Sequence, residues 1–154
     1  NPNSSIYYQN KNNECLIASL KGLIASETTL THSSGISWKL TPSKSLQDGV
    51  YDISPLELSI AKVVVQANSM VVVKAWFYRT SSSITGRLVC KGGQLDGIND
   101  DVIATTTAVG EWEELQIQLN PTASGVVEIV AQAFADVIEN PPASVFVDDL
   151  FVIS

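Results

Sequence analysis

Short runs of β-branched and aromatic residues recur along the 154-residue chain, and each run is ended by Gly, Pro, Ser, Asn or Asp. This pattern is typical of strands separated by turns. No segment shows the repeat of a long helix. The runs predict strands at 27–31, 35–41, 60–65, 69–79, 84–91, 102–107, 111–119, 125–135 and 144–153. So many short strands predict an all-β fold in which two antiparallel sheets pack face to face as a β-sandwich.

The length and the charge of the chain limit the classes of function that it can have. A chain of 154 residues suits one domain with a single core. The net charge of −7 argues against nucleic-acid binding, which needs clustered Lys and Arg. Apolar segments such as 63–65 and 71–73 are broken by polar residues, far short of the roughly 20 residues that span a bilayer. We therefore expect no nucleic-acid partner and no membrane insertion.

The N-terminal part differs from the rest of the chain. The segment from Cys15 to Leu20 suits either a strand or one helical turn. We expect 1–24 to be an N-terminal arm or connector and 25–154 to be the jelly-roll sandwich domain. Asn1 follows no Met and no leader sequence, as expected of a mature, trimmed or excised chain. Turn-forming residues predict a crossover between the sheets at 47–55 and a long polar loop at 92–101.

Alternation along each strand assigns side chains either to the core or to solvent. The inward rows predict a shared core that contains Val73, Phe77, Leu115, Ile117, Ile129 and Val147. Trp38 alternates with Leu40 and is expected in this core. If the strands share a sheet, its outward face carries six further side chains: Trp76, Tyr78, Arg87, Gln116, Gln118 and Gln132.

These six outward residues have the chemistry of a sugar-binding site. The apolar face of a pyranose stacks on Trp or Tyr, and its hydroxyl groups bond to amides and guanidinium groups. We therefore name all six as candidate ligand-binding residues. The alternative is an ordinary solvated face, or one on which Trp76 is covered by a loop or by a neighbouring subunit.

Two adjacent carboxylates, Asp148 and Asp149, interrupt the apolar final strand. Because side chains alternate across a strand, the two acids are expected to point to opposite faces, with one of them beside the core. A carboxylate in that position needs hydrogen-bond donors or a metal ion to offset its desolvation. Both possibilities remain open from these residues alone.

Four segments carry a family resemblance: the final stretch 143–154, Ser34-Gly-Ile-Ser-Trp-Lys-Leu-Thr-Pro42, the apolar strand from Met70 to Tyr78, and Gly110-Glu-Trp112. Together they resemble the jelly-roll carbohydrate-binding modules of families 4, 9 and 22. The resemblance implies a jelly roll that binds glycans and catalyses nothing. It also implies a structural calcium ion held by Asp148 or Asp149 with Glu27, and a Trp112 ring buried at the sandwich edge.

Catalytic and thiol chemistry find little support in the sequence. The one histidine, His32, lies in a polar segment, and the chain has no Gly-x-Ser-x-Gly elbow. The adjacent acids at 113–114 and at 148–149 diverge across their strands, so neither pair suits a glycosidase. Cys15 and Cys90 are too few for a disulfide scaffold, and we expect two separate, buried thiols. We therefore expect no enzyme.

A second resemblance begins at Lys62. It is carried by Gly86-Arg-Leu-Val-Cys-Lys-Gly-Gly93, Glu111-Trp-Glu-Glu-Leu115, Ala123-Ser-Gly-Val-Val-Glu-Ile129 and Ser144-Val-Phe-Val-Asp-Asp149, which are similar to C-terminal jelly-roll domains of phage virion proteins. We therefore expect a non-catalytic module on a capsid, neck or tail-fibre protein, at the virion surface or otherwise extracellular. Its expected partners are a glycan or other cell-surface polymer and other virion subunits. Two alternatives remain: a purely structural decoration or cementing protein, and an accessory module of a secreted glycoside hydrolase.

Overall fold

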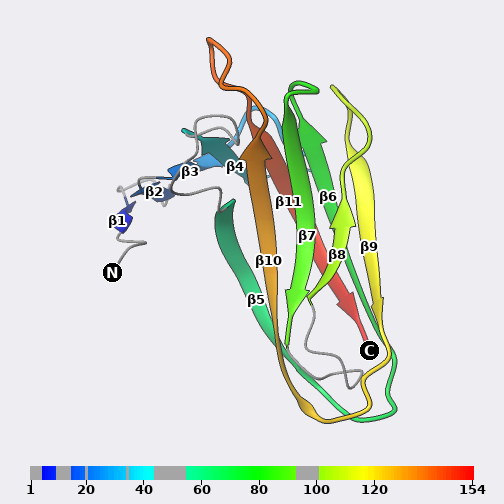
Figure 1. Cartoon of the computed structure of the whole chain (residues 1–154). Coiled ribbons are helices and arrows are strands. Elements are labelled where there is room, and N and C mark those ends of the chain that lie inside the picture. Colours follow the sequence, from blue (N-terminus) through cyan, green and yellow to red (C-terminus); the bar gives the residue numbers. More distant parts are fainter. Residues whose placement is uncertain (1–4, 10–14, 20, 34, 44–54, 93–100) are drawn as a thin grey trace.

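The computed structural model describes residues 5–9, 15–19, 21–33, 35–43, 55–92 and 101–154, with side chains from residue 21 onward. Eleven strands form its two antiparallel sheets, and the described residues contain no helix. This part of the chain accordingly has no helix of the length and apolarity that crossing a membrane requires. The two sheets pack face to face (Figure 1). The predicted all-β sandwich is confirmed.

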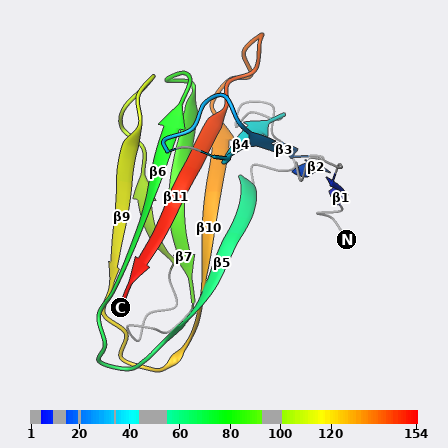
Figure 2. The ribbon, with the colours of Figure 1, turned by 180° about the vertical axis from the view of Figure 1, so that it is seen from behind.

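The larger sheet, sheet A, has the strand order β1–β2–β3–β4–β11–β6–β9. Its strands are β1 (Ser5–Gln9), β2 (Cys15–Ser19), β3 (Gly22–Glu27), β4 (Ser37–Pro42), β11 (Val145–Ile153), β6 (Val71–Arg79) and β9 (Glu113–Leu119). The smaller sheet, sheet B, has the order β5–β10–β7–β8. Its strands are β5 (Leu56–Val65), β10 (Gly125–Ala135), β7 (Ile84–Lys91) and β8 (Val102–Thr105). Figure 1 views the molecule from sheet B, and Figure 2 views it from sheet A.

Strand ends follow the turn-forming residues. Strands β7 and β10 occupy the predicted ranges 84–91 and 125–135 residue for residue. The predicted strand at 27–31 is wrong, because β3 ends at Glu27. The Glu27 carboxylate accepts hydrogen bonds from the backbone N–H and the hydroxyl of Thr29. Such a local side-chain bond offers the backbone an alternative to the sheet, so the chain turns there.

The N-terminal segment also forms strands. Residues 15–19 are β2, which decides between the two conformations that the sequence left open. Strand β3 pairs with β4 and crosses residues 24 and 25, where the division between arm and sandwich was predicted. That division stays a prediction. Figures 1 and 2 show β1 and β2 projecting sideways from the sandwich. Most of the predicted crossover at 47–55 and of the predicted loop at 92–101 lies outside the described residues.

The core lies between the two sheets. The side chains predicted to share it are all at most 6% exposed, namely Val73, Phe77, Leu115, Ile117, Ile129 and Val147. Trp38 packs against this core, as predicted. Gly86 of β7 also faces the interior, where a Cβ atom would lie 2.9 Å from Val145 Cγ1 and 3.2 Å from Phe77 Cδ2. A glycine at this position therefore allows sheet B to approach sheet A closely.

Strand β11 contains a β-bulge at its two acids. Asp148 pairs with Trp76 and Phe151 pairs with Lys74, so β11 has one residue more than β6 between these two pairs. Asp149 has a φ of 51°, a conformation that Asp adopts more readily than most residues. The prediction that the two acids point to opposite faces is wrong. The bulge directs both carboxylates to the outer face of sheet A, where they bond to the segment at 32–33.

Candidate functional site

The structure divides the six candidate ligand-binding residues between two opposite faces. Trp76 and Tyr78 of β6, with the two glutamines of β9, belong to the outer face of sheet A. Arg87 of β7 and Gln132 of β10 belong to the outer face of sheet B. The condition that these strands share one sheet is not met, because the chain passes from sheet A to sheet B between β6 and β7. The molecule therefore has two candidate faces, each with part of the predicted set.

Four polar residues form one row across sheet B. Glu57 of β5 pairs with Gln132 of β10. Gln132 also pairs with Arg87 of β7, which pairs in turn with Thr105 of β8. These residues alternate with core residues of the same strands, so their side chains project from the outer face. This cross-strand row places a carboxylate, an amide, a guanidinium and a hydroxyl on neighbouring strands.

Hydrogen bonds fix one half of the cross-strand row. Gln132 Nε2 donates to Glu57 Oε1 over 2.7 Å. Lys91 Nζ donates to the same carboxylate, at 2.9 Å from Oε1 and 2.8 Å from Oε2. Gln132 is only 7% exposed, so its amide has little freedom to turn. Polar groups that are already ordered lose less conformational entropy when a ligand binds.

The other half of the row keeps its hydrogen-bonding capacity. The Arg87 guanidinium lies over the Phe134 ring, with Cζ 4.4 Å from the ring centroid. The Arg87 Nε atom is buried and has no hydrogen-bond partner among the described residues. A cation–π contact orients a guanidinium without using its N–H donors. Arg87 is therefore held in place by the ring, and its Nε is a buried donor that no described residue satisfies.

Aromatic side chains on the outer face of sheet A pack against one another. The His32 ring stacks on Trp76, with centroids 3.9 Å apart and planes 14° apart. Trp112 lies 5.7 Å from His32 and 5.5 Å from Tyr78, centroid to centroid. Tyr78 also meets Phe146 at 6.0 Å. These five rings form the aromatic cluster. Of the alternatives for Trp76, coverage by a loop is the one that the structure shows.

The two acids of the bulge hold the loop that carries His32. Asp149 Oδ2 accepts a hydrogen bond from His32 Nδ1 at 2.8 Å, and Asp149 Oδ1 accepts one from Ser33 Oγ at 2.7 Å. Asp148 Oδ2 accepts one from the backbone N–H of His32 at 2.9 Å. The bonds from His32 and Ser33, in that order, hold the pKa of the Asp149 carboxyl below its ordinary value. Figure 2 shows the segment between β3 and β4 crossing in front of β11.

The acids predicted to bind calcium are engaged in hydrogen bonds. Asp148 and Asp149 accept hydrogen bonds from the loop at 32–33, and Glu27 accepts one from the backbone N–H of Thr29. Within the described ranges, no three His, Cys, Asp or Glu side chains gather as a metal site. Calcium needs six to eight oxygen ligands, whereas N–H and O–H donors point at the oxygens here. The residues in this arrangement do not fit the ion, and calcium binding by Asp148, Asp149 and Glu27 stays a prediction.

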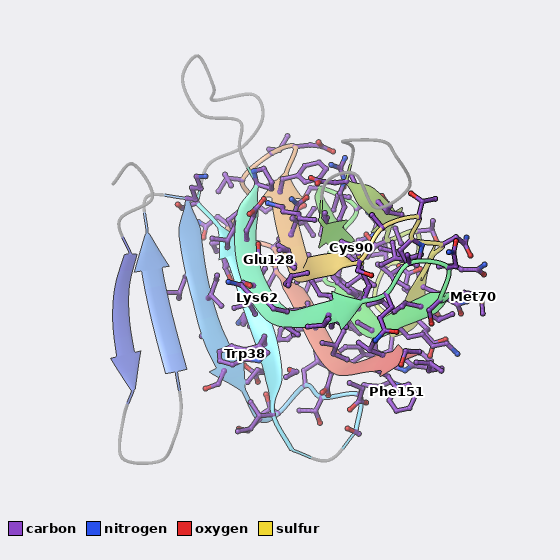
Figure 3. All side chains as sticks on the ribbon, turned by 90° about the horizontal axis from the view of Figure 1, so that it is seen from below. Trp38, Lys62, Met70, Cys90, Glu128 and Phe151 are labelled. Atoms are coloured by element: carbon purple, nitrogen blue, oxygen red, sulfur yellow. The ribbon has the colours of Figure 1, made fainter. Side chains whose placement is uncertain are left out.

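The two predicted glutamines of β9 lie on a polar part of sheet A. Gln116 is exposed and pairs with Lys74, whereas Gln118 is exposed and pairs with Val72. Phe151, 61% exposed, pairs with Lys74 from the other side. Figure 3 shows Phe151 projecting from the body of the molecule. The glutamines are thus separated from Arg87 and Gln132 by the whole sandwich, and their part in binding stays a prediction.

The neighbouring Ser33, Asp149 and His32 do not form a nucleophilic triad. In such a triad the imidazole lies between the hydroxyl and the carboxylate and takes the hydroxyl proton. Here the hydroxyl and the imidazole both bond to the carboxylate. Cys90 is a free, buried thiol, and burial raises its pKa to about 11, far from the range of a nucleophilic thiolate. Neither group has the geometry or the ionisation that covalent catalysis requires.

Sequence reasoning missed Glu57, which joins the cross-strand row to Lys91. The predicted strand began at residue 60, whereas β5 begins at Leu56. The alternation Leu56-Glu57-Leu58-Ser59 was the signal that places Glu57 on the outer face. His32 lies in a polar segment of the sequence and in a loop of the structure. Its contact with Trp76 joins segments that are far apart in the sequence.

Comparisons with solved structures agree on the fold, although no family model and no curated protein matches the sequence. The chain is similar to the Family 16 Carbohydrate Binding Module-2, with a TM-score of 0.57, 15% identity and 85% of each chain covered. It is similar to the CBM22-1-GH10 modules of Clostridium thermocellum endo-1,4-beta-D-xylanase 10B complexed with xylohexaose (TM-score 0.56, 12% identity), covering 98% of this chain and 28% of that one. The CBM22-1-CBM22-2 tandem domain of Paenibacillus barcinonensis Xyn10C gives a TM-score of 0.56 at 18% identity, with 100% and 50% covered. The fold is that of carbohydrate-binding modules.

Proposed function

We propose that this chain is a non-catalytic module that binds a glycan on the outer face of sheet B. The cross-strand row carries this proposal, because it places donors and acceptors on neighbouring strands of one face. The fold supports it, since the solved structures that share the sandwich include modules described as carbohydrate-binding.

Each part of this face suits one part of a sugar. Sugar hydroxyls both donate and accept, so they bond to a carboxylate, an amide and a guanidinium together. The Arg87 guanidinium covers one face of the Phe134 ring, and the rest of this partly exposed ring suits the C–H groups of a sugar ring. Val89 and Val130 of the same face are at most 1% exposed and therefore covered, so the exposed apolar surface beside the row is that of Phe134. Apolar surface with a few ordered polar groups is the usual composition of a small-molecule site.

The outer face of sheet A is the second candidate, because Trp76 and Tyr78 retain the stacking chemistry of a sugar site. His32 lies against Trp76 at 3.9 Å and bonds to Asp149. A sugar that stacks on this face of Trp76 first has to displace a ring that is both stacked and hydrogen-bonded. On the outer face of sheet B, Arg87 also covers one face of the Phe134 ring, but its Nε atom has no hydrogen-bond partner in the described structure.

The assembly that carries the module is a finer part of the proposal. The similarity from Lys62 onward supports a phage virion, at whose surface the module also contacts other virion subunits. The solved xylanase, in which such a module accompanies GH10 modules, supports an extracellular accessory role beside a glycoside hydrolase. A purely structural decoration protein is the third possibility. Capsid or tail genes beside this one, or a catalytic domain on the same chain, decide among these settings.

Binding to a glycan array, followed by affinity measurement on the best glycan, tests the proposed face. We expect Arg87→Ala and Phe134→Ala each to weaken binding at least about tenfold, a loss of roughly 1.4 kcal/mol. Glu114→Ala, exposed on the opposite sheet, is the matched control and should leave binding unchanged. Thermal melting confirms that the variants fold. A wild-type chain that binds no glycan contradicts the proposal, and loss of binding in Trp76→Ala alone moves the site to sheet A.

A further inference from the structure

We infer that the glycan is acidic, with uronic-acid carboxylates that Arg87 recognises. This inference rests on the proposed function, because it names the substrate class of the same face. The unpaired guanidinium of Arg87 carries it.

Arg87 is the cation of sheet B for which no described strand of the sheet supplies a neighbouring carboxylate. The strands of this sheet carry three cations and two acids. Lys91 forms an ion pair with Glu57 at 2.8 Å. Lys62 stands opposite Glu128 in the register of β5 and β10, and Figure 3 labels both. The register partners of Arg87 are Gln132 and Thr105, both uncharged. Within the described strands, one positive charge on this sheet therefore lacks a counterion.

The environment of Arg87 makes this charge suitable for a carboxylate. Its guanidinium lies over Phe134, which fixes the plane of the group. Its Nε atom is buried and unpartnered in the described structure, so no described carboxylate neutralises the group through this atom. A planar guanidinium bonds a planar carboxylate through two parallel N–H···O bonds, which are stronger and more directional than bonds to a hydroxyl.

The charge of the whole chain makes this position selective. The net charge of −7 repels an anionic polymer from most of the surface. Within the described strands of sheet B the outward charges are balanced except at Arg87, so an acidic polymer on this face meets a positive charge there. Electrostatic complementarity of this kind contributes more to specificity than to affinity. We therefore expect Arg87 to select acidic over neutral sugars, while the rest of the row binds both.

Matched polymers that differ only in the carboxylate test the inference. The probes are polygalacturonate, alginate and hyaluronate, each compared with its own carboxyl-reduced form, in which the carboxylate has become a neutral CH₂OH group. We expect the chain to bind at least one acidic polymer about tenfold or more tightly than its reduced form at low salt. This preference should decline as sodium chloride is added, because salt screens the charge–charge attraction.

Two substitutions locate the effect. Arg87→Gln removes the charge and keeps an N–H donor, so the ratio of affinities for the acidic and the reduced form should fall to about one, whatever the change in binding to the reduced form. Lys74→Gln removes a cation from the outer face of sheet A and should keep the preference intact. Melting curves of both variants confirm the fold.

The outcomes separate this inference from the proposed function. Equal binding of the acidic and reduced forms overturns the acidic specificity and leaves glycan binding on sheet B standing. A preference that survives in Arg87→Gln also overturns the inference, because the charge then acts from elsewhere. If no polymer binds and the glycan array is also empty, the proposed function fails together with the inference.

Discussion

At the scale of single residues, the backbone angle of Asp149 determines what the last strand does. Its φ of 51° belongs to the bulge that directs both acids toward His32 and Ser33. Alternation in the sequence predicted two diverging acids, because a pattern of residue types does not reveal the sign of φ. Asp is enriched at positive φ but is not restricted to it. The importance of these acids was therefore predictable from the sequence, whereas their direction was not.

Replacing Asp149 by Asn should make stability less dependent on pH. The pKa of this carboxyl is lowered, chiefly by the bond from His32. A carboxyl with a lowered pKa in the folded state stabilises the fold above its ordinary pKa, and that contribution disappears as the pH falls through the lowered value. We expect Asp149→Asn to cost at most about 1 kcal/mol at pH 7, since the group is partly exposed.

Melting curves from neutral pH to acid check this prediction. The difference between wild type and Asp149→Asn should shrink as the pH falls below the ordinary carboxyl range. Glu114→Gln, an exposed acid of β9, is the control. A difference that stays constant down to acid pH contradicts the role assigned to the charge of Asp149.

Chelation tests the calcium prediction for Asp148, Asp149 and Glu27. Because these carboxylates accept hydrogen bonds from N–H and O–H groups, we expect EDTA to leave the melting temperature unchanged. A ligand that binds only the folded state raises stability by an amount that grows with its free concentration relative to its Kd, so a bound ion has a measurable signature. A melting temperature that falls in EDTA and returns with added calcium establishes the ion and refutes the hydrogen-bonded arrangement.

At the scale of the elements, local patterns identified strands but not their neighbours. The ranges of β7 and β10 followed directly from alternation and turn residues. Whether β6 and β7 share a sheet depends on how the chain turns after Arg79, which no local pattern records. The sequence therefore predicted Trp76 and Arg87 on one face, whereas they lie on opposite faces of the sandwich. The cross-strand row itself depends on register between strands distant in the sequence, so only its separate members were predictable.

Removing the His32 ring should expose Trp76. The ring covers one face of the indole at 3.9 Å, so His32→Ala should increase the quenching of tryptophan fluorescence by acrylamide. The loss of the aromatic contact should also cost about 1 kcal/mol of stability. The increase in quenching should vanish in a Trp76→Phe background, which separates Trp76 from the other two tryptophans. Thr28→Ala, in the same loop, is the control. Unchanged quenching in His32→Ala would show that the loop does not cover Trp76 in solution.

At the scale of the whole molecule, the core was the most predictable part. Every side chain that the sequence placed in it is buried, because one apolar face per strand leaves little choice of orientation.

Ile129 of β10 is fully buried within this core. We expect Ile129→Ala to lower the free energy of unfolding by roughly 2 to 5 kcal/mol through lost burial and cavity formation. Denaturant titration measures this value, with Val126→Ala, on an exposed position of the same strand, as the control. A loss below about 0.5 kcal/mol is typical of surface positions and contradicts the core assignment.

Because Cys90 is buried, the rate at which thiol reagents label it reports local opening of the fold. Thiol reagents attack the thiolate, and a pKa of about 11 keeps that form scarce while β7 stays in place. In a chain whose Cys15 is replaced by Ser, the rate of labelling at Cys90 therefore measures how often sheet B opens. Cys90 lies three residues along β7 from Arg87. A sugar that binds that face as proposed should therefore lower the labelling rate of Cys90 in proportion to its occupancy. If the chain binds a glycan as proposed, the labelling rate of Cys90 thus records that binding without any catalysed reaction.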